Sequence, residues 1–164
     1  MTDFFSRIFH VPDYYIHVLI NPLPLYGLGV AWLGLLLACF VRSRPAQVTA
    51  LILVLFTSLS AWPTIEFGES GYDVMLSRSD NTGSAWLKEH KARADKFEVY
   101  FYFLAALATA ALLLPLRWKK TALPLTIAVL LGGLVVLALA GYIAYPAGRV
   151  RHSEFRMGPP PKDS

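Results

Sequence analysis

Histidine is the residue type of this chain best suited to bind haem iron or a transition metal, because a neutral ring nitrogen is a good ligand for both. The sequence carries four histidines, at His10, His17, His90 and His152. Counted along the chain, His17 lies six residues before Leu23, His90 seven before Phe97 and His152 seven after Tyr145. The helical rise converts these spacings to about 10 Å. All four fall on the side of the termini and of the longest polar segment, so we expect any chemistry at one face.

These histidines allow two interpretations. In the first, His17, His90 and His152 bind a cofactor such as haem b, or His17 and His90 bind a metal with Glu69 and Asp73 as oxygen ligands or hydrogen-bonding partners. In the second, the imidazoles only form hydrogen bonds with lipid headgroups, backbone or water. No closely spaced pair such as HxxxH fixes a ligand geometry, so the sequence leaves both open.

The sequence predicts no catalytic residues and no enzyme. A Ser–His–Asp set can be assembled from His90, Asp95 and a loop serine, but no spacing supports it. The centres of the hydrophobic runs contain no ionisable residue; Glu66 and Glu98 lie only at their margins. Proton pumps, ion-coupled transporters and voltage sensors need such residues inside the membrane, so these classes are disfavoured.

Four hydrophobic runs must position the histidines. The chain has 164 residues, 55% of them hydrophobic, and a mean hydropathy of +0.49. The runs cover residues 16–41, 46–63, 97–115 and 122–146, and about 20 apolar residues suffice to cross a bilayer as a helix. We therefore predict an all-α fold with residues 1–164 as one membrane domain. Its four transmembrane helices should form an up-down-up-down bundle.

The connections differ in length and charge. Two tight turns, at Arg42–Arg44 and Arg117–Lys120, are basic, whereas residues 64–96 form a long polar loop and residues 147–164 a polar tail. By the positive-inside rule, the turns face the cytoplasm, and the termini and long loop are periplasmic in a bacterial inner membrane. The aromatic stretch Asp3–His10 predicts a segment lying in the interface. The basic residues flank apolar runs, so no nucleic-acid partner is expected.

Proline, glycine and polar residues suggest where the helices begin and end. Pro22 and Pro24 predict a late start or a kink in the first span, and Pro63 and Pro146 predict the ends of the second and fourth. Within the polar loop, residues 72–76 suggest a short helix. A longer helix begins there with Ser84 as N-cap and continues unbroken into the third span.

Small residues suggest faces for helix packing. In the fourth span, one face carries Gly133, Ala140, Gly141 and Ala144. In the first span, Gly34 and Ala38 form a second set. With span interiors free of chemistry, this predicts an accessory subunit of a larger membrane complex, of an electron-transfer or respiratory type. Its partners are then the lipid bilayer and other membrane subunits. The alternative is a b-type haem or metal-binding membrane protein.

Four short motifs in order resemble an uncharacterised family of small bacterial four-span membrane proteins, a domain of unknown function. They are the histidine that opens the first span, Gly-x-Asp after the second, His-x-x-x-Ala before the third, and Gly-x-x-x-Tyr-x-x-Gly closing the fourth. Here these motifs are His17, Gly71–Asp73, His90–Ala94 and Gly141–Gly148. The resemblance covers roughly residues 15–150 and implies the four-helix fold and a haem or redox association.

Overall fold

The computed structural model describes residues 11–161, and every regular element in that range is helical. Four helical segments are long and apolar enough to cross a membrane: Asp13–Phe40, Arg44–Ser70, Asn81–Arg117 and Lys119–Arg151. The predicted all-helical class and the four candidate spans are therefore confirmed. The predicted interfacial segment Asp3–His10 lies outside the described residues.

Each of the first two segments is interrupted near its polar end. The elements, in chain order, are α2 (Asp13–Ile20), the π-helical turn η1 (Leu23–Gly27), α3 (Leu28–Phe40), α4 (Arg44–Leu59), α5 (Ala61–Ser70), α6 (Tyr72–Ser77), α7 (Asn81–Arg117), η2 (Lys119–Thr121), α8 (Ala122–Arg151) and η3 (Ser153–Phe155). Pro22 and Pro24 lack the backbone N–H that a regular helix would use, so the first segment changes from α2 to α3 through η1. The first span thus starts early and is kinked.

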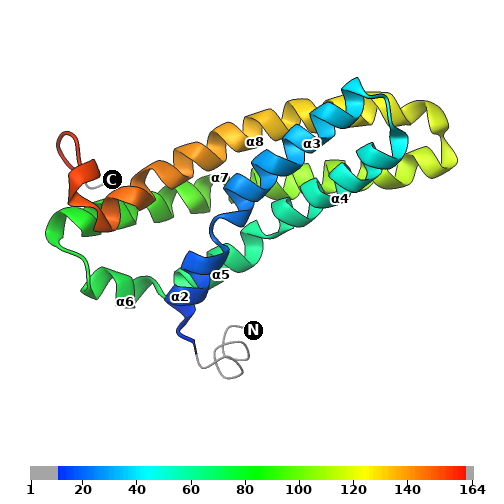
Figure 1. Ribbon diagram of the computed structural model, residues 1–164. Coiled ribbons are helices and arrows are strands. Elements are labelled where there is room, and N and C mark those ends of the chain that lie inside the picture. Colours follow the sequence, from blue (N-terminus) through cyan, green and yellow to red (C-terminus); the bar gives the residue numbers. More distant parts are fainter. Residues whose placement is uncertain (1–10, 162–164) are drawn as a thin grey trace.

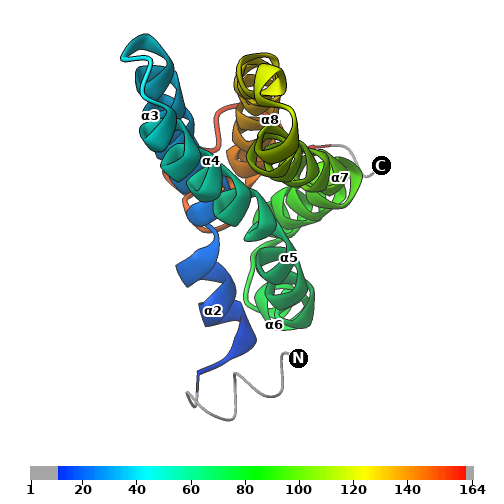
Figure 2. The same cartoon turned by 90° about the vertical axis from the view of Figure 1, so that its right-hand side faces the viewer.

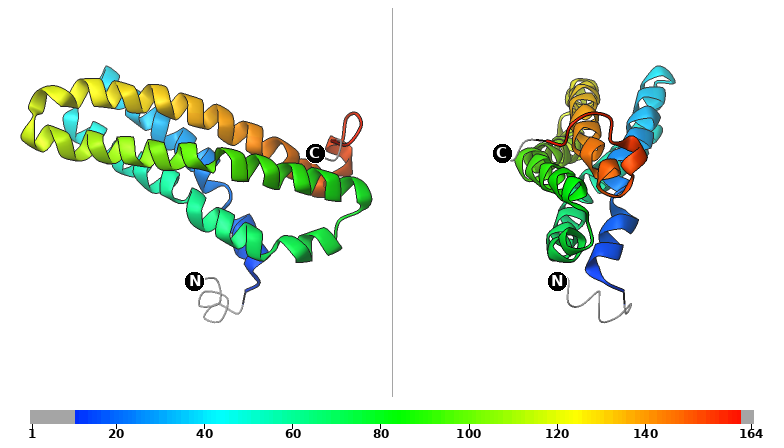
Figure 3. Two further views of the ribbon diagram at one scale, coloured as in Figure 1. Left: turned by 180° about the vertical axis from the view of Figure 1, so that it is seen from behind. Right: turned by 90° about the vertical axis from the view of Figure 1, so that its left-hand side faces the viewer.

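The long helices lie side by side as an elongated bundle. Figure 1 shows α3, α4, α7 and α8 running along one another, with both tight turns at one end of the bundle. The elements α2, α5 and α6 and the C-terminal segment lie at the opposite end, and α2 and α5 project to one side of the bundle (Figure 2). Seen from behind, α6 links the end of α5 to the start of α7 (Figure 3). The histidine-bearing segments thus share one end.

The bundle is apolar both inside and outside. Its inner faces carry small residues and a few leucines and valines that are almost fully buried, among them Ala31, Leu35, Leu51, Ala108, Ala111 and Val129. Large apolar side chains such as Leu33, Phe103 and Leu131 are more than half exposed. A helix that is hydrophobic all round suits a bilayer, where lipid covers the outer face.

Within the predicted polar loop of residues 64–96, the structure changes two helix boundaries. The helix passes through Pro63 and ends only at Ser70, because Pro63 lies in the first turn of α5, where backbone N–H groups lack helical partners anyway. The next long helix begins at Asn81, and its N-cap is Asp80 rather than Ser84, since the Asp80 carboxylate accepts the N–H of Gly83 at 2.5 Å. The predicted short helix corresponds to α6.

A proline inside α7 and another inside α8 each leave one backbone carbonyl without its helical N–H donor. In both helices, an arginine side chain donates to that carbonyl instead. Pro115 cannot donate to the carbonyl of Ala111 one turn earlier, and the Nη2 atom of Arg44 donates to that oxygen at 3.1 Å. Pro146 acts in the same way in α8, so the predicted end of the fourth span at Pro146 is wrong and the helix continues to Arg151. Because an arginine replaces the missing backbone donor, each helix continues beyond its proline.

Replacing Arg44 by methionine should destabilise the bundle by about 1–3 kcal/mol, because the carbonyl of Ala111 loses its donor. The loss should shrink in the Pro115→Ala background, where the restored backbone N–H at position 115 supplies that donor. Thermal unfolding of the single and double variants in detergent measures the coupling. Equal losses in both backgrounds would mean that Arg44 acts through other contacts.

The C-terminal segment is held against the start of α7 by one side chain. Arg156 donates to the Asp80 carboxylate at 2.7 Å, to the carbonyl of Arg149 at 2.8 Å and to the carbonyl of Val150 at 2.7 Å. It therefore satisfies carbonyls at the C-terminal end of α8 while pairing with the residue that caps α7. This contact joins the two helix ends.

The hydrogen bond from Arg156, followed by that from the Gly83 N–H, lowers the pKa of Asp80. A carboxylate whose pKa is lowered by folding contributes stability at pH values above its unfolded pKa and loses it as the pH falls through the folded value. Wild-type stability should therefore decline below about pH 4 more steeply than that of Asp80→Asn. Unfolding midpoints measured between about pH 3 and pH 7 check this; parallel curves would contradict it.

Candidate functional site

His17 is held on the inner side of α2 by the backbone of α5. Its Nδ1 atom lies 2.7 Å from the carbonyl oxygen of Thr64. A Cβ atom at Gly68 would stand only 2.8 Å from the same Nδ1 atom, so only glycine lets the ring approach α5 this closely. Because a carbonyl oxygen can only accept, Nδ1 donates its proton and Nε2 keeps its lone pair.

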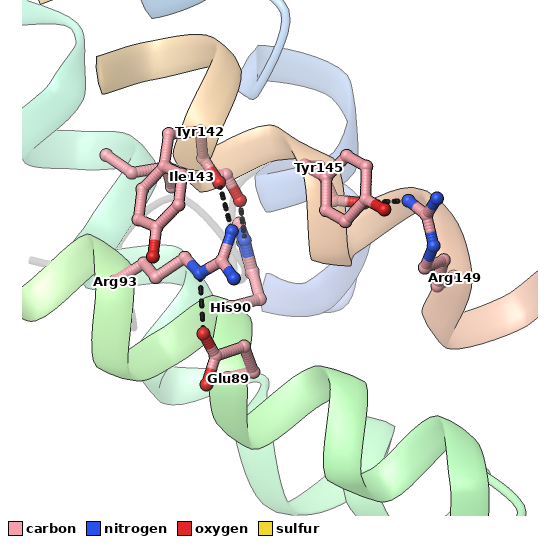
Figure 4. Close-up of polar contacts among 7 residues, drawn as sticks. All are labelled: Glu89, His90, Arg93, Tyr142, Ile143, Tyr145 and Arg149. Carbon is pink, nitrogen blue, oxygen red and sulfur yellow. Dashed lines mark hydrogen bonds and ion pairs between the residues drawn. The ribbon is translucent and has the colours of Figure 1, made fainter. Parts of the chain in front are cut away.

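His90 is held in the same way between α7 and α8. Its Nδ1 atom lies 2.8 Å from the carbonyl oxygen of Ile143 (Figure 4). One residue earlier, the carbonyl of Tyr142 has lost its helical donor to Pro146 and accepts instead from Nη1 of Arg93 at 2.8 Å. Hydrogen bonds from His90 and Arg93 to two neighbouring carbonyls of α8 therefore join α7 and α8 at this level.

Two further contacts hold the guanidinium group of Arg93 in place. Its Nε atom pairs with Glu89 at 2.6 Å, and its guanidinium lies 3.8 Å from the ring centroid of Tyr142. Figure 4 shows a second arginine over a ring of α8: Arg149 lies 3.6 Å from the centroid of Tyr145. Cation–π contacts of this kind suit an interfacial rim, where the charge stays partly hydrated.

The two imidazoles are close neighbours in an inclined rather than a stacked arrangement. Their ring centroids are 6.4 Å apart and their planes are inclined by 68°. Among the residues that the structure describes, none forms a hydrogen bond with the Nε2 atom of His17 or His90. Within the part of the chain that the structure describes, two lone pairs without a donor partner thus lie in one small region.

Both rings line a cavity of about 510 Å³ at the end of the bundle that carries α2, α5 and α6. Small-molecule sites span about 300–1,000 Å³ and are mostly apolar with a few placed polar groups. The wall fits that description, with many apolar residues and glycines from α2, η1, α5, α7 and α8, among them Leu25, Ala61, Ala94, Phe101, Ala140 and Ala144. The cavity is large enough for an organic cofactor.

The other predicted ligands do not join the two imidazoles. His152 lines the cavity but pairs with Glu154 at 2.9 Å and is exposed. Glu69 lines it too but pairs with Lys91 at 2.7 Å, while Asp73 is exposed on α6. Within residues 11–161, no three His, Cys, Asp or Glu side chains come close enough to hold a metal ion. The predicted four-ligand metal site is therefore not assembled.

The predicted packing residues fall on different faces. Gly133, Ala140 and Ala38 are buried or nearly so, and a Cβ at Gly133 would stand 2.7 Å from Cδ1 of Trp32 on α3. Ala144 lines the cavity. Gly34 and Gly141 are exposed, with no atom within 4 Å of an added Cβ. The six predicted residues therefore divide between the interior of the bundle and open helix faces.

Inside the bundle lie Gly133, Ala140, Ala144 and Ala38, and outside it lie Gly34 and Gly141.

Three residues that hold the site were not predicted: Thr64, Gly68 and Arg93. The carbonyl of Thr64 is a backbone group and leaves no trace in residue type, and Gly68 suggested a turn rather than a close approach. Arg93 had a signal, because Pro146 marks a free carbonyl four residues earlier and an interfacial arginine is a good donor for it.

Comparisons with protein-family models, with curated proteins and with solved structures find no match for this chain.

Proposed function

We propose that this chain is a membrane haem protein that holds haem b between His17 and His90 and transfers electrons. The observation that carries the proposal is the imidazole pair, with each Nδ1 atom bonded to a backbone carbonyl and each Nε2 atom without a described partner. Histidines that ligate a metal commonly donate their other N–H group to a carbonyl, which fixes the tautomer and orients the ring.

The spacing of the rings favours ligands on opposite sides of one metal atom. With metal–nitrogen bonds of about 2.0–2.1 Å, opposed imidazoles have centroids roughly 6.5 Å apart, and two neighbouring ligands of a tetrahedral ion roughly 5 Å apart. The measured centroid separation of 6.4 Å is closer to the first value than to the second, and the rings are not stacked on each other. Two imidazoles without a third ligand are incomplete for a bare ion, but a porphyrin supplies the remaining nitrogens itself.

The rest of the cavity suits such a cofactor. Its alanine and glycine residues have small side chains that leave room between the helices, and Phe101 and Leu25 would provide apolar contacts for a macrocycle. When bound, haem supplies one-electron chemistry, and the protein sets its potential through axial ligands, burial and hydrogen bonds. In this chain, the carbonyls of Thr64 and Ile143 would fix the tautomer and the orientation of both imidazoles.

The protein purified from membranes, or reconstituted with added haem in mild detergent, should show a Soret band. Its dithionite-reduced form should show the sharp α and β bands of a six-coordinate, low-spin b-type haem. Reconstitution with added haem distinguishes a protein that received too little haem during expression from a protein that has no haem site. A protein that stays colourless and does not titrate with added haem overturns the proposal.

We further propose that the four segments cross a bacterial inner membrane up-down-up-down, with the tight basic turns in the cytoplasm. The two turns are short and carry Arg42, Arg44, Arg117, Lys119 and Lys120 without an acidic residue, which supports this orientation. The haem site then lies near the periplasmic face. In a Cys39→Ala background, Ser79→Cys should react with a membrane-impermeant thiol reagent in cells whose outer membrane is permeabilised; protection of that position would reverse the orientation.

A second proposal is that the chain acts as a subunit of a larger membrane assembly. The supporting observation is that Gly34, Gly141 and Gly148 lie on exposed helix faces with no atom within 4 Å of an added Cβ, which leaves room for a neighbouring helix backbone. At native expression levels and in mild detergent, the protein should migrate as part of a larger complex. Migration as a lone monomer would count against it.

A further inference from the structure

The wall of the cavity differs in charge from one side to the other. Where α5 and α7 meet, Glu69, Asp95 and Glu98 outnumber the single cation Lys91, which pairs with Glu69 at 2.7 Å and with Asp95 at 3.1 Å. At the C-terminal end of α8, the wall instead carries the cation Arg151. A ligand with carboxylates at one edge would be repelled by the first side and attracted by the second.

Arg151 is placed on the same stripe of α8 as the residue that holds His90. Ile143, Ala147 and Arg151 follow at fourfold spacing and all line the cavity. The helical rise puts Arg151 roughly 12 Å along the axis from Ile143, toward the polar rim. Its side chain can therefore reach the outer edge of a ligand held between the imidazoles.

Among the described residues, Arg151 has no acidic partner. Its Nη2 atom donates to the sulfur of Met75 at 3.9 Å, and sulfur is a weak acceptor. The neighbouring basic side chains have other partners: Arg149 donates to the carbonyl of Tyr145, Arg156 pairs with Asp80, and His152 contacts Glu154. Arg151 is thus a charged donor on the cavity wall that is available to an anionic group.

We propose that Arg151 binds a carboxylate of the ligand held between His17 and His90, so that the cavity selects and orients a porphyrin with ionised carboxylates at one edge. This inference rests on the proposed function. The apolar edge of the porphyrin then faces Phe101 and Ala140, deeper in the bundle, and the charged edge faces the rim. Arginine suits this role because its planar fork matches a carboxylate in a bidentate pair.

The test compares haem with its dimethyl ester, in which both carboxylates are uncharged, by spectral titration of the haem-free protein in detergent. The wild-type protein should bind haem about tenfold more tightly than the ester, since a partly exposed charged pair contributes a modest amount. In Arg151→Gln, haem binding should weaken until this preference is lost, while the low-spin spectrum persists. Arg117→Gln, at the far end of the bundle, is the control and should keep the preference.

Each other outcome decides against the inference. Equal binding of haem and ester by the wild-type protein overturns it, and so does a full preference retained in Arg151→Gln. If the wild-type protein binds haem with a low-spin spectrum but does not prefer haem over the ester, the proposed function is supported and the role of Arg151 is refuted. A wild-type protein that binds neither compound overturns the proposed function and this inference together.

Discussion

The double variant His17→Ala/His90→Ala should bind no haem, and each single variant should bind it as a five-coordinate, high-spin species. In a single variant, one imidazole remains to ligate the iron and the opposite position becomes open. Affinity in the single variants should fall by about 100-fold or more, since loss even of the groups that orient a ligand costs 10–100-fold. Absorption and electron paramagnetic resonance spectra distinguish the low-spin and high-spin forms.

A matched control and a chemical rescue separate ligation from folding. His152→Ala should keep the low-spin spectrum, because His152 is exposed and pairs with Glu154 rather than with the other imidazoles. Free imidazole should restore the low-spin spectrum of His17→Ala or His90→Ala by entering the space that the side chain has left. A low-spin spectrum that persists in His90→Ala without added imidazole would show that another residue is the ligand.

The architecture could be predicted because membrane spans have a strong signal in sequence. About 20 uncharged residues in a row leave few alternatives to a helix in a bilayer, and all four runs form helices. The error lay at the polar rim, where Pro63 and Gly68 suggested a loop. Both sit inside α5, because a proline in a first turn loses no hydrogen bond and a glycine in a helix can serve a close contact.

The site was predicted only as a set of residues on one face. Helical rise placed His17, His90 and His152 at similar depth, and all three line the same cavity. Which two of them approach each other depends on how α2 packs on α5 and α7 on α8. The partners that fix the rings are backbone carbonyls, and these are invisible in residue types except where a proline marks a free one.

The close packing of α2 against α5 leads to a second large expected effect, at a residue that touches no ligand. A Cβ atom at Gly71 would stand 2.7 Å from Cβ, 2.8 Å from Cα and 2.9 Å from the backbone N of Tyr14. Backbone atoms cannot rotate aside as a flexible side chain can, so Gly71→Ala must push α2 away from the end of α5. The cost of such overpacking is about 1–3 kcal/mol of folding free energy.

The displacement should also reach the proposed haem site, because His17 follows Tyr14 by about one turn of α2. Moving α2 outward lengthens the contact between Nδ1 of His17 and the carbonyl of Thr64 and separates the two imidazoles. We therefore expect Gly71→Ala to show a lower unfolding midpoint and a shift toward high-spin haem, although both histidines are intact. Thermal unfolding and the absorption spectrum of the same sample measure the two effects.

Gly141→Ala is the matched control, since an added Cβ there meets nothing within 4 Å and the residue lies on an exposed face of α8. Its stability should be unchanged or higher by up to about 1 kcal/mol, the usual difference between alanine and glycine in a helix. If Gly71→Ala matched this control in both midpoint and spin state, the position of α2 would not govern the ligation of the haem. The contact of Tyr14 with Gly71 would then serve only to join the polar ends of the first two segments.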